Sequence, residues 1–342
     1  MRALVFRGFN RKLSLECIPD PTPGPGEVVL KVHRCGICGT DLHRTESNIF
    51  SLKPGAVPGH EFAGEVVALG SGVSTLRVGD RVTALPYLGC NACMACLSGA
   101  PNFCTQMRNV GSDEMTGGYA EYVAVGAPWC VKLPQALSME DGALVEPLAV
   151  GLHAIVRAGL KAGDRVAVIG AGPIGLAAIW WARRAGAGRI VATATSDRRA
   201  ALARDMGADA FLAAAPGESP ANAVVEALGG GADIVFECVG LPGLLDQAIA
   251  CAKVRGVVAV LGVCVTRDPY LPLLAMAKEV DVRFSVVYDL REFQHCVDAL
   301  DRGDVAPRAM ITDRATLDEA PDAFEALRSR TRQCKVMISP WS

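Results

Sequence analysis

Short apolar runs alternate with turn-forming residues along most of the chain. The runs EVVLKVHR (27–34), VAVI (166–169) and ADIVFECVG (232–240) are short and rich in β-branched residues, which predicts strands. The longer runs LSMEDGALVEPLAVGLHAIVRAG (137–159) and GLAAIWWA (175–182) are typical of helices. Because buried strands and helices alternate in the second half of the chain, we expect an α/β fold with a doubly wound parallel sheet.

The longest uncharged stretch, residues 166–182, approaches the length that can span a membrane. Three glycines and Pro173 interrupt it, so a buried strand that leads into a buried helix is the better interpretation, and we expect no membrane partner. The N-terminal MRALVFRGFNRKLSL is predicted to be a first strand, because the four apolar residues between its arginines are too few for a secretory signal.

A glycine-rich turn separates this strand from this helix. Gly170, Gly172 and Gly175 form the pattern G-x-G-x-x-G. The pattern is weak alone, but after a strand and before a helix it is typical of the dinucleotide-binding Rossmann fold. The first glycine permits the tight turn, the second lets the backbone approach a pyrophosphate, and the third allows close packing, while the helix N-terminus faces the phosphates.

Further residues complete the predicted cofactor site. GVVAVLGVC (256–264) is predicted to be another buried strand of the same sheet. The remaining candidates lie in the glycine turn or at the end of this strand: Pro173, Ile174, Leu261, Gly262 and Val263.

The end of the second strand predicts the nicotinamide cofactor. An NAD-binding chain places an acid there against the ribose, but here the position is Ala194, followed by Thr195 and Ser196. Arg198 and Arg199 come next, and guanidinium groups bind a 2′-phosphate, so NADP is favoured. NAD remains the alternative if Asp197 is the ribose acid, although the helical run after it suggests a helix start.

Charge and cysteine content narrow the class of partner. The chain has 34 basic and 36 acidic residues and a formal net charge of −2, so nucleic acid is not an expected partner and small molecules are. Thirteen cysteines, an odd number, argue against a disulfide framework and favour a reducing cytoplasm.

Four of these cysteines lie close together in sequence. Their spacing is C-x2-C-x2-C-x7-C, and such short loops wrap four thiolates around one Zn²⁺ in a closed, structural site. An iron–sulfur cluster uses the same ligands and is not excluded by spacing, and four unrelated buried thiols are the remaining alternative. The residues are Cys90, Cys93, Cys96 and Cys104.

A second set of metal-ligand residue types is dispersed. Cys38 lies in CGICGTDLH, His60 in GHEFAGEVVALG and Glu146 in EPLAVGLHA. Each has an ordinary structural interpretation when taken alone, as a core thiol, a structural histidine or a helix start.

These motifs and the four-cysteine lobe, in this order, resemble the medium-chain zinc-dependent alcohol and polyol dehydrogenases over essentially the whole chain. The glutamate of EPLAV is most similar to the sorbitol and butanediol dehydrogenase branch. The resemblance implies that Cys38, His60 and Glu146 bind a catalytic zinc, the second zinc of the chain. It also implies that Glu61 can enter or leave the zinc shell and that Asp41 orients His60.

The resemblance further implies a proton relay for an alcohol oxidation that zinc assists by stabilising charge on the alcohol oxygen. Thr40 would accept the proton from the alcohol, the cofactor ribose would relay it, and His43 would release it to solvent. The structural alternatives are a helix cap for Thr40 and a solvent-facing side chain for His43.

The substrate is less well determined. Sorbitol dehydrogenases have a polyol-binding arginine before a tyrosine in the segment that matches SVVYDLREF, whereas here Val287 precedes Tyr288. We therefore expect a less polar secondary or primary alcohol, or the matching ketone or aldehyde, with carbonyl reduction as the direction that NADP favours. An NAD-dependent polyol or butanediol dehydrogenase is the alternative.

The family resemblance also implies the domain order. We expect a β-rich, GroES-like catalytic domain at 1–150 with a structural zinc lobe at 89–105, a Rossmann domain at 151–288, and a return to the catalytic domain at 289–342. A homotetramer or homodimer is implied as well. Two rival classes are a zinc-ribbon protein that binds nucleic acid, disfavoured by the near-neutral charge and the glycine turn, and a zinc-free relative, which would lack the dispersed ligands.

Overall fold

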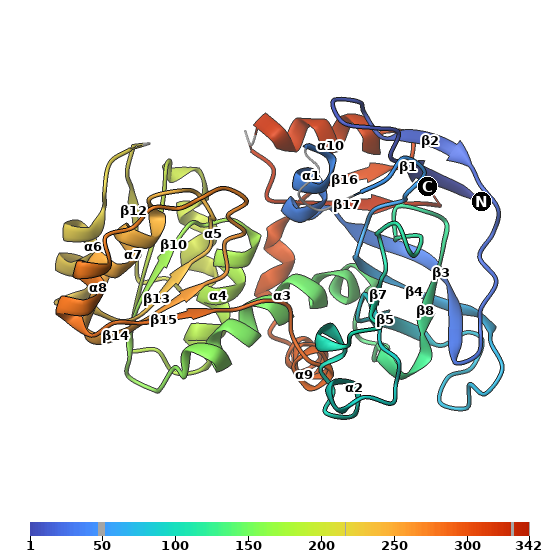
Figure 1. Cartoon of the computed structure of the whole chain (residues 1–342), viewed down its shortest axis with the longest axis horizontal. Coiled ribbons are helices and arrows are strands. Elements are labelled where there is room, and N and C mark those ends of the chain that lie inside the picture. The colour runs from blue at the N-terminus through green and yellow to red at the C-terminus, as the bar shows by residue number, and fades with distance from the viewer. Residues whose placement is uncertain (47–51, 216, 330–331, 342) are drawn as a thin grey trace. The chain divides into compact units, whose positions relative to one another are not determined.

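The computed structural model describes residues 1–46, 52–215, 217–329 and 332–341. The chain forms two compact units, one made of Met1–Glu146 with Tyr288–Ser342 and one made of Pro147–Val287. Both combine sheets and helices, which confirms the expected α/β fold (Figure 1). Helix α3 (Met139–Ala158) contains the boundary, and Pro147, which has no N–H to donate within the helix, is the first residue beyond it.

The unit Pro147–Val287 is built on a six-stranded sheet in the order β12-β11-β10-β13-β14-β15. Every neighbouring pair is parallel, so this is the doubly wound order that the sequence predicts. Its strands are β10 (Arg165–Ile169), β11 (Arg189–Ala194), β12 (Ala210–Ala213), β13 (Ala232–Glu237), β14 (Ala252–Val260) and β15 (Asp281–Phe284). Its further helices are α4 (Pro173–Arg184), α5 (Ala200–Asp205), α6 (Ala221–Leu228), α7 (Leu244–Cys251) and α8 (Pro272–Lys278).

The apolar runs of this unit become its core. Val166, Ala167 and Val168 of β10 are completely buried, because a parallel strand at the centre of a sheet is covered on both faces. Residues 166–182 thus form a buried strand followed by helix α4, as predicted. In the part of the chain that the structure describes, no helix is long and apolar enough to cross a membrane.

The other unit is centred on a seven-stranded sheet with β16-β17-β3-β4-β5-β9 as its path and β8 paired with β3. These strands are β3 (Glu27–Gly36), β4 (Glu61–Leu69), β5 (Arg81–Ala84), β8 (Tyr122–Gly126), β9 (Cys130–Lys132), β16 (Ile311–Thr316) and β17 (Lys335–Ser339). Two small sheets pair β1 (Arg2–Val5) with β2 (Ser14–Cys17) and β6 (Tyr87–Leu88) with β7 (Arg108–Asn109). Its helices, besides α3, are α1 (Gly39–Glu46), α2 (Met94–Leu97), α9 (Leu290–Asp301) and α10 (Ala320–Ser329).

Strands from both ends of the chain meet in this sheet. β17 pairs antiparallel with β3, and β3 pairs with β4, so residues from the C-terminal segment lie beside the N-terminal strands (Figure 1). The loops that leave β3 and enter β4 begin and end at the same edge, where Gly36 faces Glu61. This register places Cys38, just after β3, close to His60, just before β4.

Candidate active site

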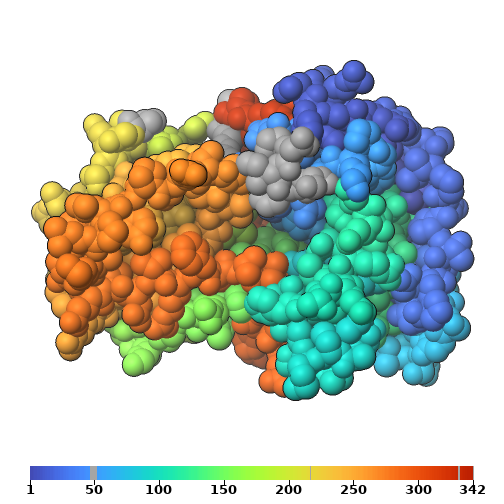
Figure 2. Space-filling model, viewed as in Figure 1, coloured from blue at the N-terminus to red at the C-terminus, as the bar shows by residue number. Residues whose placement is uncertain are grey.

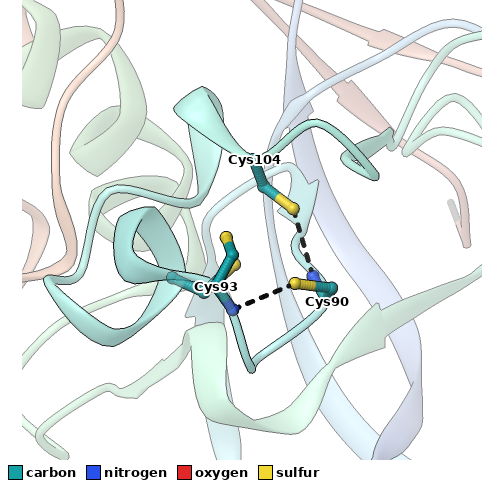
Figure 3. A group of neighbouring side chains, drawn as sticks. Cys90, Cys93 and Cys104 are labelled. Atoms are coloured by element: carbon teal, nitrogen blue, oxygen red, sulfur yellow. Dashed lines mark hydrogen bonds between the residues drawn. The ribbon is translucent and has the colours of Figure 1, made fainter.

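The four cysteines of the lobe lie together. The sulfur atoms of Cys90, Cys93, Cys96 and Cys104 are all within 4.8 Å of one another, an arrangement that could hold a metal ion. Backbone N–H groups point at the sulfurs: Cys93 N donates to Cys90 Sγ at 3.3 Å, and Cys90 N donates to Cys104 Sγ at 3.4 Å (Figure 3). N–H groups that donate to sulfur stabilise thiolates, which are the form that binds zinc.

The pKa values of two of these thiols are shifted in opposite directions. Hydrogen bonds from the backbone of Ala92 and Cys93 lower the pKa of Cys90 to about 6. Burial raises the pKa of Cys96 to about 12, so a metal ion would have to displace the proton of that thiol.

Glycines allow the lobe to close around its sulfurs. A Cβ at Gly89 would lie 2.3 Å from Cys96 Sγ, and Gly99 has a positive φ of 84° after helix α2. The segment lies at the surface of its unit, where Figure 2 shows it in teal, and it exposes Met94, Leu97 and Phe103. Because the lobe has so little core of its own, a metal ion bound by the four sulfurs would stabilise its shape.

A second cluster forms where β3 and β4 meet. One ligand atom each of Cys38, His60 and Glu61 lies within 4.8 Å of the others. Thiolate, imidazole and carboxylate are the ligand types that zinc takes in proteins, so this donor set fits that metal. Glu146, the third ligand expected from the family resemblance, lies on helix α3. Among the described residues, the group of converging ligand atoms contains Glu61 and not Glu146.

Asp41 is positioned to hold the imidazole of His60. Its Oδ1 lies 3.3 Å from His60 Nδ1, and neither buried atom has a standard hydrogen bond to any other described group. The hydroxyl of Tyr119 donates to the other oxygen of Asp41 at 2.6 Å. Because Asp41 lies against Nδ1 of His60, Nε2 is the nitrogen available to a metal, an arrangement typical of metal-bound histidines.

Charges in the cluster shift the pKa of both partners. Burial alone would raise the pKa of Asp41, but His60 and Tyr119 outweigh this effect and lower it to about 2. Burial alone would lower the pKa of His60, whereas the charges of Asp41 and Cys38 raise it well above the usual value. The same negative charges would favour a cation bound beside the imidazole.

Glu61 has an unexpected partner at the other end of the chain. Lys335, the first residue of β17, donates to Glu61 Oε1 at 2.7 Å and to Glu61 Oε2 at 2.6 Å. Both side chains are buried, with 2% and 1% exposed. Burial alone would lower the pKa of Lys335, but the charges of Glu61 and Cys38 outweigh it and raise the pKa.

Glu146 is held by a tyrosine network. The hydroxyl of Tyr288 donates to Glu146 Oε1 at 2.8 Å, and the Tyr87 ring lies 6.2 Å from the Tyr288 ring. Burial raises the pKa of Glu146 to about 7. Its carboxyl group can therefore change protonation state near neutral pH.

The two predicted proton-relay residues share helix α1. Thr40 and His43 are three residues apart, so they lie on one side of the helix. Thr40 N donates to Cys38 Sγ at 3.4 Å, and His43 Nδ1 lies 3.5 Å from Glu46 Oε2, with 29% of the His43 side chain exposed.

The glycine turn has the geometry that its sequence predicts. Gly170 has a φ of 95°, and a Cβ there would lie 2.4 Å from Val239 Cγ2. Gly172 is the N-cap residue of helix α4, and Pro173 with Ile174 begins that helix. A Cβ at Gly175 would lie 1.8 Å from the carbonyl oxygen of Gly170, so only glycine fits there.

The residues predicted to choose the cofactor follow β11. Ala194 ends the strand, and Thr195 and Ser196 lead into a short 3₁₀ turn, Asp197–Arg199. Arg198 Nε donates to Ser196 Oγ at 3.0 Å, whereas Arg199 Nη1 donates to the carbonyl of Ala171, inside the glycine turn, at 3.1 Å. The two arginines therefore have different contacts.

Leu261, Gly262 and Val263 follow β14 and lie beside the end of β13. Leu261 N and Gly262 N donate to the carbonyl oxygen of Glu237 at 2.8 and 3.0 Å. The Glu237 side chain accepts from the N–H groups of Val239 and Gly240 at 2.7 and 2.9 Å. Glu237 is buried and organises both loops, a role that sequence analysis missed because the residue looked like part of an ordinary strand.

Two family models match the chain. Residues 24–135 match the alcohol dehydrogenase GroES-like domain, and residues 173–302 match the zinc-binding dehydrogenase model. Among curated proteins, sorbitol dehydrogenase of Bacillus subtilis (strain 168) is 31% identical over 345 residues, which cover 99% of this chain and 97% of the relative. The (R,R)-butanediol dehydrogenase of the same organism is 35% identical, with 98% and 99% covered.

Solved structures agree with these relatives. A zinc-binding dehydrogenase from Sinorhizobium meliloti 1021 bound to NADP has a TM-score of 0.88, 33% identity and 99% of each chain covered. An alcohol dehydrogenase from Escherichia coli CFT073 in complex with NADH has a TM-score of 0.89, 27% identity and the same coverage. This chain belongs to the medium-chain zinc-dependent alcohol and polyol dehydrogenases, oxidoreductases that act on CH–OH groups with zinc and a nicotinamide cofactor.

Proposed function

We propose that the enzyme interconverts a secondary or primary alcohol, less polar than a sugar alcohol, and its ketone or aldehyde with NADP, at a zinc bound by Cys38 and His60. The observation that carries the proposal is the convergence of Cys38, His60 and Glu61 within 4.8 Å. The buried contact between His60 and Asp41 supports it, because it orients the imidazole.

Zinc bound there would stabilise negative charge on the alcohol oxygen and so ease hydride removal from the neighbouring carbon. Cys38 and His60 provide two ligands, with Glu61 or Glu146 as further candidates. Glu146 would keep its carboxyl group toward the site through its bond to Tyr288. A second zinc, held by the four cysteines of the lobe, would stabilise the fold and take no part in the reaction.

The chain's own residues would move the proton. Thr40 Oγ1 would accept it from the alcohol, and His43 would release it to solvent. Glu46 Oε2, at 3.5 Å from His43 Nδ1, gives the imidazole a neighbour on the same helix that can hold its orientation.

The preference for NADP is proposed from the end of β11. Ala194 leaves no carboxylate to bind the ribose hydroxyls, and the pair of Ser196 and Arg198 offers a hydroxyl and a guanidinium to a 2′-phosphate. Arg199 would instead brace the glycine turn through the carbonyl of Ala171. One structural relative binds NADP and another NADH, so the fold is compatible with either cofactor.

The substrate is proposed to be less polar than a sugar alcohol. Val287 offers neither charge nor hydrogen bond where sorbitol dehydrogenases have a polyol-binding arginine. The alternative is an NAD-dependent polyol or butanediol dehydrogenase, which the similarity to the sorbitol and butanediol enzymes favours.

A reducing cytoplasm fits the thirteen cysteines, all of which are free thiols in the described chain.

Initial rates with NADP and NAD over alcohols, ketones and aldehydes of graded polarity test both choices. We expect kcat/KM to favour NADP by more than about tenfold, or about 1.4 kcal/mol, and Arg198→Ala to remove most of this preference. A kcat/KM for NAD that equals or exceeds the value for NADP would contradict the cofactor assignment.

A single substitution tests the substrate class. Val287→Arg should raise kcat/KM for sorbitol by about tenfold relative to 2-butanol, because a guanidinium would add hydrogen bonds to a polyol. Val287→Leu is the matched control and should leave this ratio within about twofold. A wild-type enzyme that already prefers sorbitol over 2-butanol would overturn the substrate proposal.

A further inference from the structure

The ion pair between Glu61 and Lys335 satisfies every hydrogen-bonding group of the ammonium. Lys335 Nζ donates to both oxygens of Glu61, at 2.7 and 2.6 Å, and to the carbonyl oxygen of Ile37 at 3.1 Å. An ammonium has three donors, so none is left over. Such a group is held in one position and is not free to turn toward other acceptors.

The sheet register builds a slot for this pair. Gly36 of β3 faces Glu61 of β4 on one side and Met337 of β17 on the other. A Cβ at Gly36 would lie 2.2 Å from Glu61 Oε2 and 3.2 Å from Lys335 Cδ. The missing side chain is therefore what allows carboxylate and ammonium to meet inside the sheet.

A buried ion pair of this kind does little for stability. Removing two charges from water costs several kcal/mol, and an apolar pair of similar volume is often at least as stable. Stability alone therefore gives a weak reason for the charges.

The carboxylate has a second possible partner close by. Glu61 belongs to the cluster whose ligand atoms with Cys38 and His60 lie within 4.8 Å. Both of its oxygens are nevertheless engaged by Lys335. A cation at the cluster and the ammonium of Lys335 thus share one carboxylate, and the negative charge that the ammonium neutralises is not available to the cation.

We propose that Lys335 is a positioning residue that keeps Glu61 a weak, displaceable ligand of the catalytic metal. Because Lys335 holds both carboxylate oxygens, Glu61 is a weaker donor to the metal. The substrate can then displace Glu61 and take its coordination position. The inference rests on the proposed zinc site at Cys38 and His60. It predicts that removing the ammonium strengthens the metal shell, whereas most substitutions beside a metal site weaken it.

The test measures metal binding, not turnover, with the full-length protein purified with zinc. Release of zinc to a chromogenic chelator is followed for the wild type, Cys38→Ser, Lys335→Met and Lys335→Arg. Cys38→Ser identifies which phase of release belongs to the catalytic site. Arg308→Met is the matched control, since it removes the cation from another buried carboxylate of this unit, Asp141.

In Lys335→Met, we expect the catalytic-site phase to be about tenfold slower than in the wild type, because Glu61 then has the metal as its main partner. In Lys335→Arg, whose planar guanidinium binds both carboxylate oxygens, release should be as fast as in the wild type or faster. Arg308→Met should leave the phase unchanged. Slower release from Lys335→Arg, or unchanged or faster release from Lys335→Met, would overturn the inference.

Cobalt substitution gives a readout that a purely structural role of Lys335 would not change. The visible bands of Co²⁺ depend on its ligands, so Lys335→Met should shift them and Lys335→Arg should not. Bands identical in wild type and Lys335→Met would overturn the inference while leaving the zinc site intact. If the wild type and Cys38→Ser release the same amount of metal, the proposed zinc site itself fails, and the inference fails with it.

Discussion

At the scale of single residues, buried charges concentrate where helix α3 begins. Asp141 is completely buried and accepts hydrogen bonds from Arg308 Nε at 2.7 Å, Arg308 Nη2 at 2.9 Å and Ser138 Oγ at 2.7 Å. Burial alone would raise the pKa of Asp141, but these bonds outweigh it and lower the pKa below its usual value of 3.8. The carboxylate is thus more stable in the folded chain than in the unfolded chain.

The first prediction concerns the pH dependence of this contribution. Because the folded-state pKa is depressed, the stabilisation is present above about pH 4 and is lost as pH falls through the folded-state pKa. Asp141→Asn should lower the free energy of unfolding by about 2 kcal/mol at pH 7, and this difference should shrink below about pH 4. Urea unfolding of both proteins at several pH values measures it. A difference that stays constant from pH 7 to pH 3 would contradict the assignment.

A glycine in the cysteine lobe gives the second prediction. Gly89→Ala would place a Cβ 2.3 Å from Cys96 Sγ, too close for the sulfur to keep its position. We expect the variant to lose about one zinc per chain, since a lobe with little core depends on its metal. Elemental analysis after gel filtration measures the loss. Gly39→Ala, where nothing lies within 4 Å of the added carbon, is the control and should retain the lobe zinc.

The candidate site was predictable from sequence to different extents. The four lobe cysteines were recognisable from spacing, because a closed metal site can be built from one short segment. Cys38 follows strand β3 and His60 precedes strand β4, in separate segments of the chain, and only the family resemblance connected them. Lys335 had no sequence signal, since it is 274 residues from Glu61 and reaches it only through the register of three strands. The functional roles of all these residues stay predictions.

At the scale of elements, helix α1 carries both proposed proton-relay residues but has only eight residues. An isolated helix of this length is unstable in water, so tertiary contacts must hold it. Arg328 of helix α10 provides such contacts at its C-terminal end: the guanidinium donates to Thr45 Oγ1 at 2.8 Å, to Glu46 Oε1 at 2.7 Å and to the carbonyl of Leu42 at 3.4 Å. These bonds tie the last two turns of α1 to helix α10.

The third prediction tests whether this support matters for catalysis. Arg328→Met should lower kcat/KM about tenfold and speed hydrogen–deuterium exchange in residues 39–46, while the free energy of unfolding falls by only about 1 kcal/mol. Arg332→Met is the control, because Arg332 forms an exposed ion pair with Asp313. If exchange in α1 and kcat/KM are both unchanged in Arg328→Met, the helix does not depend on this arginine.

Long elements were predictable and short ones were not. The strand β10 and helix α4 follow from an apolar run interrupted by glycines, because a central parallel strand is buried on both faces. Strands β6, β7 and β9 have only two or three residues, too few to show a periodic pattern. They form because longer strands and the cysteine lobe hold them in place.

At the scale of the whole molecule, one end of the parallel sheet is exposed. Strand β15 pairs with β14 and is the last strand of its sheet in the described residues. Its Phe284 is 70% exposed, and Met276 and Leu273 of the adjacent helix α8 are 70% and 56% exposed. Figure 2 shows these segments in orange on the face in view. Unpaired strand edges with apolar side chains are sites of association, so this edge is where we expect the homodimer or homotetramer implied by the family resemblance to form a contact.

The fourth prediction is that this edge joins two chains. Two copies of β15 related by a two-fold axis would pair antiparallel and bury the same apolar side chains on both sides, a contact that closes as a dimer. Phe284→Lys should therefore halve the molar mass measured by light scattering, because it would place two like charges in one apolar contact. Val78→Lys changes a side chain that is 63% exposed in the other unit and should leave the mass unchanged. A wild-type protein that is monomeric at micromolar concentration, or a Phe284→Lys variant with the wild-type mass, would show that this edge does not join two chains.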